Sequence, residues 1–108
     1  MILTTTNSIE GHNIIDYLGI VTGISYNSSY SYKGKSMSFK DMFSKQKYFE
    51  IYEESLENIK EEAFQKLQNN AKVLGANAVV GIQVDIETLA NTTTLIVSIT
   101  GTAVKVAV

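Results

Sequence analysis

Residues 74–82 read LGANAVVGI, a stretch that ends one element of structure and begins the next. Gly75 stands where a helix commonly ends in a left-handed glycine. The apolar residues after it predict a buried strand over 78–88. The alternating pattern of residues 93–106 predicts a second strand. Because only a short turn at 90–92 separates the two strands, we expect an antiparallel pair.

A long amphipathic helix is predicted over residues 46–74, which contain no Gly or Pro. Acidic residues dominate its first half and Lys72 lies in its last turn, as the helix dipole favours. Its apolar stripe at three-and-four spacing consists of Phe49, Tyr52, Leu56, Ile59, Ala63, Leu67 and Leu74. Such a helix is about 40 Å long. In a chain of 108 residues, that length indicates that one end extends beyond its own sheet, toward a partner subunit.

Two further strands are predicted before the helix. A short strand covers residues 2–5, and a longer one covers residues 13–26, where β-branched and aromatic residues dominate. One face of the longer strand is expected to carry Ile14, Leu18, Ile20 and Ile24. Gly19 and Gly23 lie on the other face beside Val21, and glycine within a strand marks a bend or a close backbone approach.

These elements predict an α+β fold in one domain over residues 1–108. The expected order is β-α-β-β, with an antiparallel sheet packed against one long helix. Residues 27–45 are rich in Ser, Tyr and Lys and are expected to form a variable surface loop.

Composition excludes several classes of function. The chain has no Cys, which rules out disulfides, thiolate catalysis and cysteine-based zinc sites. Its net charge is −2, without the basic stripe that nucleic acid requires, so we expect no nucleic-acid partner. No apolar run approaches the roughly 18 residues of a membrane span. Because Met1 leads into threonines instead of a secretory signal, we expect a cytoplasmic protein.

Two groups of residues could bind a divalent metal ion. Asp85 and Glu87 project from the same side of one predicted strand, and paired carboxylates suit hard cations. Glu10 and His12 lie together in a predicted turn, where the imidazole could add a nitrogen ligand. The alternative for the first pair is an ordinary polar outer face, and for His12 a solvated turn residue. Repetition of the acidic pair around a symmetry axis would concentrate its charge.

Catalytic motifs are absent from the sequence. His12 is the sole histidine and has no serine near it in a recognisable motif, and no glycine-rich phosphate loop occurs. We therefore expect no enzymatic activity. The dense tyrosines are Tyr26, Tyr30, Tyr32, Tyr48 and Tyr52. They fit either a contact with a subunit or partner, or a loop folded back over the sheet.

Four segments carry a family resemblance: LTTTNSIEG at 3–11, YLGIVTG at 17–23, LGANAVVG at 74–81 and SITGTAV at 98–104. In this order they resemble the YbjQ-like family, small bacterial proteins for which heavy-metal binding has been suggested. The chain departs from the family within residues 27–47, a stretch that ends in an arginine- and glycine-rich segment in the family. Here KDM at 40–42 stands in for the first part of that segment, and SKQK at 44–47 replaces its glycines.

The resemblance implies a dodecin-like β-α-β-β subunit and a ring-shaped homo-oligomer, expected to be a pentamer. It leads us to expect a non-enzymatic binding or scaffold protein, with any small ligand between subunits or on the central axis. The alternative is a metal-binding protein that uses the oxygen-rich residues named above.

Overall fold

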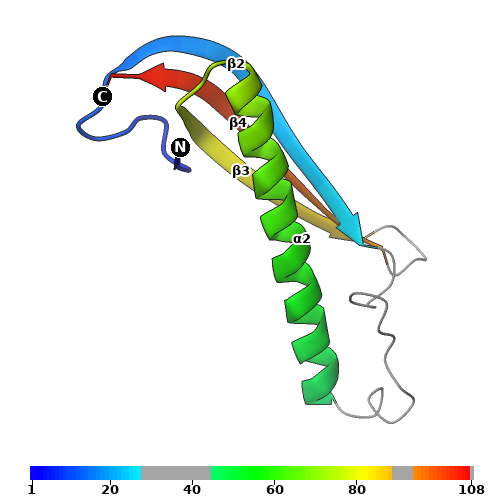
Figure 1. The fold of residues 1–108 in the computed structure, drawn as a ribbon. Coiled ribbons are helices and arrows are strands. Elements are labelled where there is room, and N and C mark those ends of the chain that lie inside the picture. The colour runs from blue at the N-terminus through cyan, green and yellow to red at the C-terminus, as the bar shows by residue number, and fades with distance from the viewer. Residues whose placement is uncertain (28–44, 89–93, 108) are drawn as a thin grey trace.

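The computed structural model describes residues 1–27, 45–88 and 94–107, and Figure 1 shows a sheet with one long helix along it. The elements in chain order are β1 (Ile2–Leu3), β2 (Ile14–Asn27), α2 (Lys45–Val73), β3 (Ala78–Thr88) and β4 (Leu95–Val106). The predicted α+β class and the β-α-β-β order are confirmed. The predicted turn at 90–92 lies outside the described residues. So does the predicted loop at 27–45, except for its end residues 27 and 45.

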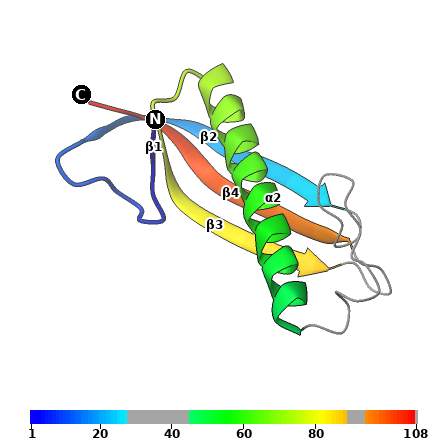
Figure 2. The ribbon, with the colours of Figure 1, turned by 60° about the horizontal axis from the view of Figure 1, so that its bottom comes forward.

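The sheet is mixed, with the order β1-β3-β4-β2 (Figure 2). Its three long strands are antiparallel neighbours, with β4 in the centre, as expected. The two-residue strand β1 instead runs parallel to the start of β3, with Ile2 opposite Ala78. Because parallel neighbours are distant in sequence, local patterns did not reveal this pairing.

The end of α2 forms a Schellman motif around Gly75. This residue has φ +83°. Its N–H donates to the carbonyl of Lys72 at 2.9 Å, and the N–H of Ala76 donates to the carbonyl of Ala71 at 3.1 Å. These are the two bonds that satisfy the last carbonyls of such a helix. The helix stop predicted at Gly75 is therefore confirmed.

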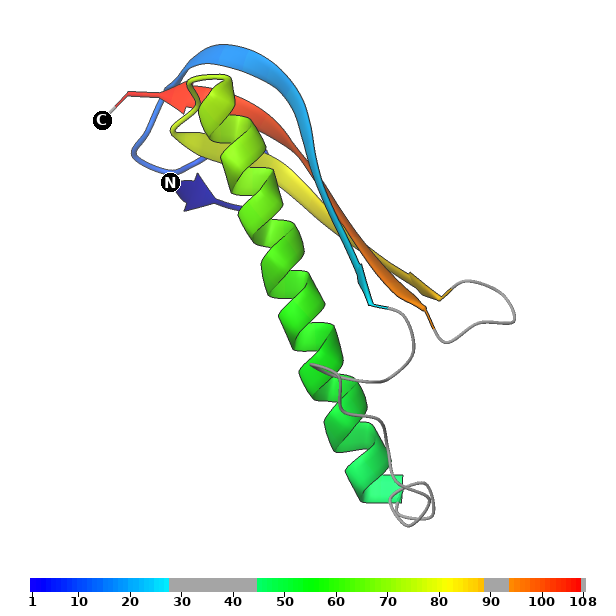
Figure 3. The same ribbon diagram turned by 45° about the vertical axis from the view of Figure 1, so that its right-hand side comes forward.

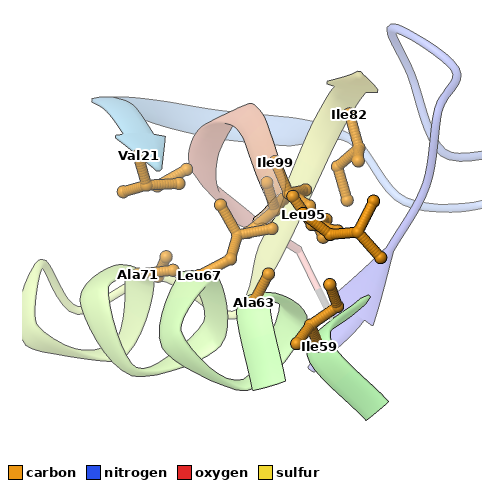
Figure 4. Packing of buried hydrophobic residues seen from close by; sticks show 12 residues of the cluster. Val21, Ile59, Ala63, Leu67, Ala71, Ile82, Leu95 and Ile99 are labelled. Carbon is orange, nitrogen blue, oxygen red and sulfur yellow. The ribbon is translucent and has the colours of Figure 1, made fainter. Parts of the chain in front are cut away.

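One face of the sheet forms the main core with α2 (Figure 4). The helix contributes Ile59, Ala63, Leu67 and Ala71, all buried, so the predicted stripe continues to Ala71 and not to the exposed Leu74. From the sheet, the largest fully buried side chains are Leu95, Val97, Ile99 and Val79. The side chains of Phe49 and Tyr52 lie outside the described ones.

Gly23 lets the helix approach the sheet backbone. A Cβ at this position would overlap the carbonyl oxygen of Ala63 and would stand 2.7 Å from the amide nitrogen of Leu67. The small residue is therefore a packing requirement, as expected for a glycine inside a strand. It places α2 over β2 and β4, with little contact to β3.

A bulge in β3 breaks the simple alternation of that strand, which predicts Ala78, Val80, Ile82, Val84 and Ile86 on one face. Gly81 has φ +62°, and the register with β4 shifts between Val80 and Gln83. Because a bulge adds one residue to one strand, every side chain beyond it changes face. The helix side of β3 therefore carries Val79, Ile82, Val84 and Ile86. Its outer face carries Ala78, Val80, Gln83, Asp85 and Glu87.

β2 also differs from the predicted pattern, since its register with β4 shifts at two places before Ile20. Gly19, with φ +124°, lies at the second shift. Leu18 packs into the helix-side core, whereas Ile20 and Ile24 are exposed on the outer face. The four residues expected to share one face are thus divided between both.

Residues 4–13 cover only one end of the outer face. Ile9 and Ile14 pack there on a small second core made of Ala78, Val80, Val104 and Val106.

The side chain of Asn77 adds two hydrogen bonds to the sheet at this end. Its amide nitrogen donates to the carbonyl of Val106 at 3.0 Å, and its oxygen accepts from the N–H of Val106 at 2.8 Å.

The helix is longer than the core that it covers. Its 29 residues correspond to about 43 Å. Figures 1 and 3 show its N-terminal end extending past the ends of the strands, and the molecule measures 55 × 22 × 21 Å. The overhang expected from the sequence is present in this arrangement.

The close approach at Gly23 can be tested by comparing two glycines. We expect Gly75→Ala to lower the free energy of unfolding by about 1 kcal/mol, because a left-handed conformation disfavours a Cβ. Gly23→Ala should cost about 2–3 kcal/mol, because the backbone of α2 must move. Urea unfolding at one fixed protein concentration would measure both losses. A smaller loss for Gly23→Ala than for Gly75→Ala would contradict this packing.

Candidate functional site

The most unusual surface of the described chain is an apolar row on the outer face of β2. It consists of Tyr17, Ile20, Ile24 and Tyr26, which we call the β2 column. Their exposed fractions are 68%, 77%, 51% and 70%. These side chains lie on one face because they are opposite Val104, Thr102, Ser98 and Ile96 of β4. Thr22 is the one polar residue between Ile20 and Ile24 on this face. Exposed apolar surface of this extent indicates a site of interaction.

A second apolar surface lies on the other side of the sheet. A hollow of about 360 Å³ opens between the chain after β1, α2 and β3, and it is lined by Leu3, Thr4, Thr5, Phe64, Ile82 and Val84. Val84 is 40% exposed, and Ile86, two residues further along β3, is 45% exposed. We call this hollow with Ile86 the β3–α2 recess. It exists because α2 lies over β2 and β4 and makes little contact with β3, so that Val84 and Ile86 on this side stay partly exposed.

A polar hollow lies at the free edge of β2. It is lined by Thr22, Ile24, Lys66, Asn69 and Asn70. The Lys66 ammonium donates to the carbonyl of Ile24 at 3.0 Å, and the Asn70 amide donates to the carbonyl of Thr22 at 2.8 Å. Helix side chains therefore occupy two acceptors that an incoming strand would use. This arrangement protects the edge from pairing with another chain.

The predicted acidic pair lies on the outer face of β3. Asp85 is opposite Ser98 and Glu87 is opposite Ile96, and both carboxylates are exposed. Within the described ranges, no group of three or more His, Asp or Glu side chains is arranged to hold a metal ion. One chain thus supplies two carboxylates at this place, without a third ligand of these types.

The second predicted pair lies in the turn before β2. Glu10 is exposed, His12 is half-buried, and the N–H of His12 donates to the carbonyl of Ile9 at 3.1 Å. His12 Nδ1 lies 2.9 Å from the carbonyl oxygen of Ala107. Because a carbonyl oxygen only accepts, Nδ1 carries the hydrogen of this bond. A neutral imidazole with its hydrogen on Nδ1 keeps a free lone pair on Nε2. Hydrogen bonds of this kind orient the histidines that bind metal ions in proteins.

The two predicted pairs do not come together in one chain. His12 contacts the end of β4 at Ala107, whereas Asp85 is opposite Ser98. The path along β4 from Ser98 to Val106 is about 26 Å at about 3.3 Å per residue. A shared site would therefore need residues from different copies of the chain.

Sequence reasoning missed the β2 column as a surface. Of the dense tyrosines, only Tyr26 has a described side chain, and it belongs to the column. A signal for the column was present, because residues 14–26 carry large apolar side chains at both odd and even positions. A strand of this kind is covered on both faces. In the described part of the chain, only one of these faces is covered along most of β2.

No helix within the described ranges is long and apolar enough to cross a membrane. The fold itself is found in a solved structure. A crystal structure of a protein of unknown function from Pediococcus pentosaceus, assigned to the DUF74 family, aligns with a TM-score of 0.58. The alignment covers 99% of this chain and 98% of that one at 19% identity, a level that reports shared fold alone.

The profile of one protein family matches the chain over residues 1–107. The family carries the description "Putative heavy-metal-binding", and the match includes β1, the helix and every long strand described above. The protein is therefore a member of the YbjQ family.

Proposed function

We propose that this protein is a subunit of a homo-oligomeric ring, a pentamer, that serves as a binding or scaffold protein in the cytoplasm. The observation that carries the proposal is the β2 column. Its four large side chains are more than half exposed, and their burial against a partner would stabilise the folded protein substantially. A second copy of the chain is always present at the same concentration and is the simplest partner to cover them.

Two further features support self-assembly. The helix extends beyond the sheet of its own subunit and offers surface to a neighbour. The β3–α2 recess gives the same chain a second uncovered apolar surface. A domain of this size buries only about 60–70% of its unfolded surface, so association adds to a modest core.

The hollows favour binding over catalysis. Among the residues that line the two described hollows, Lys66 is the one ionisable side chain, and its ammonium is bound to Ile24 and near Glu62. Acid–base or nucleophilic catalysis needs a base beside a reacting group. The described hollows do not offer such a pair, and this supports a non-enzymatic role.

Self-assembly predicts that concentration controls both mass and stability. We expect native mass spectrometry and sedimentation velocity to give about 60 kDa, five times the 11.9 kDa of one chain. The thermal midpoint should rise with protein concentration, because association stabilises the folded chain by mass action. An 11.9 kDa species at every concentration, with a constant midpoint, would refute the proposal.

Metal binding is the second candidate function, and the bond between His12 and Ala107 favours it. This bond orients the imidazole and leaves Nε2 as a ligand atom. Zn²⁺, Ni²⁺ or Co²⁺ would suit one imidazole with carboxylates, whereas the absence of Cys disfavours softer ions. Since one described chain provides no group of three such ligands, the site would be completed by other copies in the ring.

The metal candidate predicts a stabilisation that depends on particular side chains. We expect Zn²⁺ at about 100 times its dissociation constant to stabilise the wild type by about 2.7 kcal/mol. If the imidazole is a ligand, His12→Gln should remove this stabilisation by Zn²⁺. If the acidic pair binds the ion, the double variant Asp85→Asn with Glu87→Gln should remove it. Glu61→Gln, a matched change on an exposed part of α2, should leave it unchanged. Calorimetric titration without binding of any of the three ions would exclude this candidate.

A further inference from the structure

We infer that the copies meet head to tail, with the β2 column of one subunit packed into the β3–α2 recess of the next. The inference rests on the proposed self-assembly and adds which surfaces are joined. Both surfaces belong to the described part of the chain. Each is apolar, and the described residues of the same subunit leave Ile20 and Tyr26 of the column and Val84 and Ile86 of the recess at least 40% exposed.

The positions of the two surfaces exclude a single symmetric contact between them. The column lies on the outer face of β2, and the recess lies on the helix side of β3. β2 and β3 flank β4 on opposite sides, as Figure 2 shows. A two-fold contact between two columns would leave both recesses in water. A contact of column with recess covers every column and every recess once the ring closes.

The two surfaces also match in chemistry, and the recess has room for part of the column. Tyr17, Ile20 and Tyr26 project from a strand, with exposed fractions of 68–77%. The recess is a hollow of about 360 Å³ whose apolar wall is formed by Leu3, Phe64, Ile82 and Val84. Projecting apolar side chains that fill an apolar hollow form the well-packed centre typical of protein interfaces.

The area of the column suits an interface between copies. Its four side chains expose roughly 500 Å² in total, given the size of aromatic and branched aliphatic residues. A stable interface buries about 800 Å² on each partner. The column therefore supplies more than half of what one side needs, and the surrounding strand residues supply the rest.

The protected edge of β2 determines the type of contact. Asn70 and Lys66 occupy the carbonyls of Thr22 and Ile24 on the side where another strand would pair. A neighbour therefore does not extend the sheet at these residues. It meets the face of β2 through side chains, and this is the geometry that the column and recess require.

The inference is tested by one variant on each surface. Ile20→Lys places a charge in the column and keeps the recess intact, whereas Val84→Lys does the reverse. Both residues are at least 40% exposed, so we expect both chains to fold, with unchanged circular dichroism spectra. Each variant alone should be monomeric, with a mass of 11.9 kDa in native mass spectrometry. Val73→Lys, at an 84% exposed site in the last turn of α2, is the matched control and should assemble as the wild type.

A mixture of the two variants gives a stricter result. Each mixed pair has one intact column and one intact recess, so equimolar chains at high concentration should form heterodimers and no larger species. If Val84→Lys misfolds, Ile86→Lys tests the same surface at a position that is 45% exposed. Recess variants that assemble like the wild type would overturn the head-to-tail contact while leaving self-assembly intact. A monomeric wild type would refute the proposed assembly itself.

Discussion

The structure depends on the close approach of α2 to β2 at Gly23. The carbonyl of Ala63 and the amide of Leu67 stand where any larger residue at position 23 would place its Cβ. This contact sets the helix over β2 and β4, where Ala63, Leu67 and Ala71 bury their small or branched side chains. The position of the helix in turn decides which part of the sheet stays uncovered. It is the helix side of β3 around Val84 and Ile86, and the β3–α2 recess follows from it.

The bulge at Gly81 completes this arrangement. Without it, Val84 and Ile86 would lie on the outer face of β3, and Asp85 and Glu87 would lie on the helix side. With it, they line the uncovered side, while Asp85 and Glu87 occupy the outer face. The chain after β1 fixes the bulge, since the N–H of Gly81 donates to the carbonyl of Thr6 at 2.8 Å and that of Ile82 donates to the carbonyl of Thr4 at 3.1 Å. Two glycines therefore create the β3–α2 recess, one of the two surfaces that the proposed contact joins.

The proposed assembly also bears on the metal binding that the description of the family suggests. Within the described residues, one chain holds its candidate ligands at separate ends of β4 and in groups smaller than three. In the proposed ring, each group would recur once per subunit, so that symmetry would supply the ligands that one described chain lacks. Lys66 and Asn70 occupy two carbonyls at the β2 edge, so a neighbour at these residues would meet β2 through side chains. A head-to-tail contact of this kind forms a ring where its rotation closes.

The sequence by itself determined the elements and their order. The stop at Gly75, the stripe of Ile59, Ala63 and Leu67, and the alternation in β4 depend on neighbours within a few residues, so local periodicity was enough to predict them. The tertiary structure alone decided the parallel pairing of β1, the shift of faces at Gly81 and the exposure of Ile20 and Ile24. Each of these depends on residues distant in sequence, and one extra residue in a strand reverses every side chain beyond it. The candidate ligands were identifiable by type, but their separation along β4 was set by the folding of the chain.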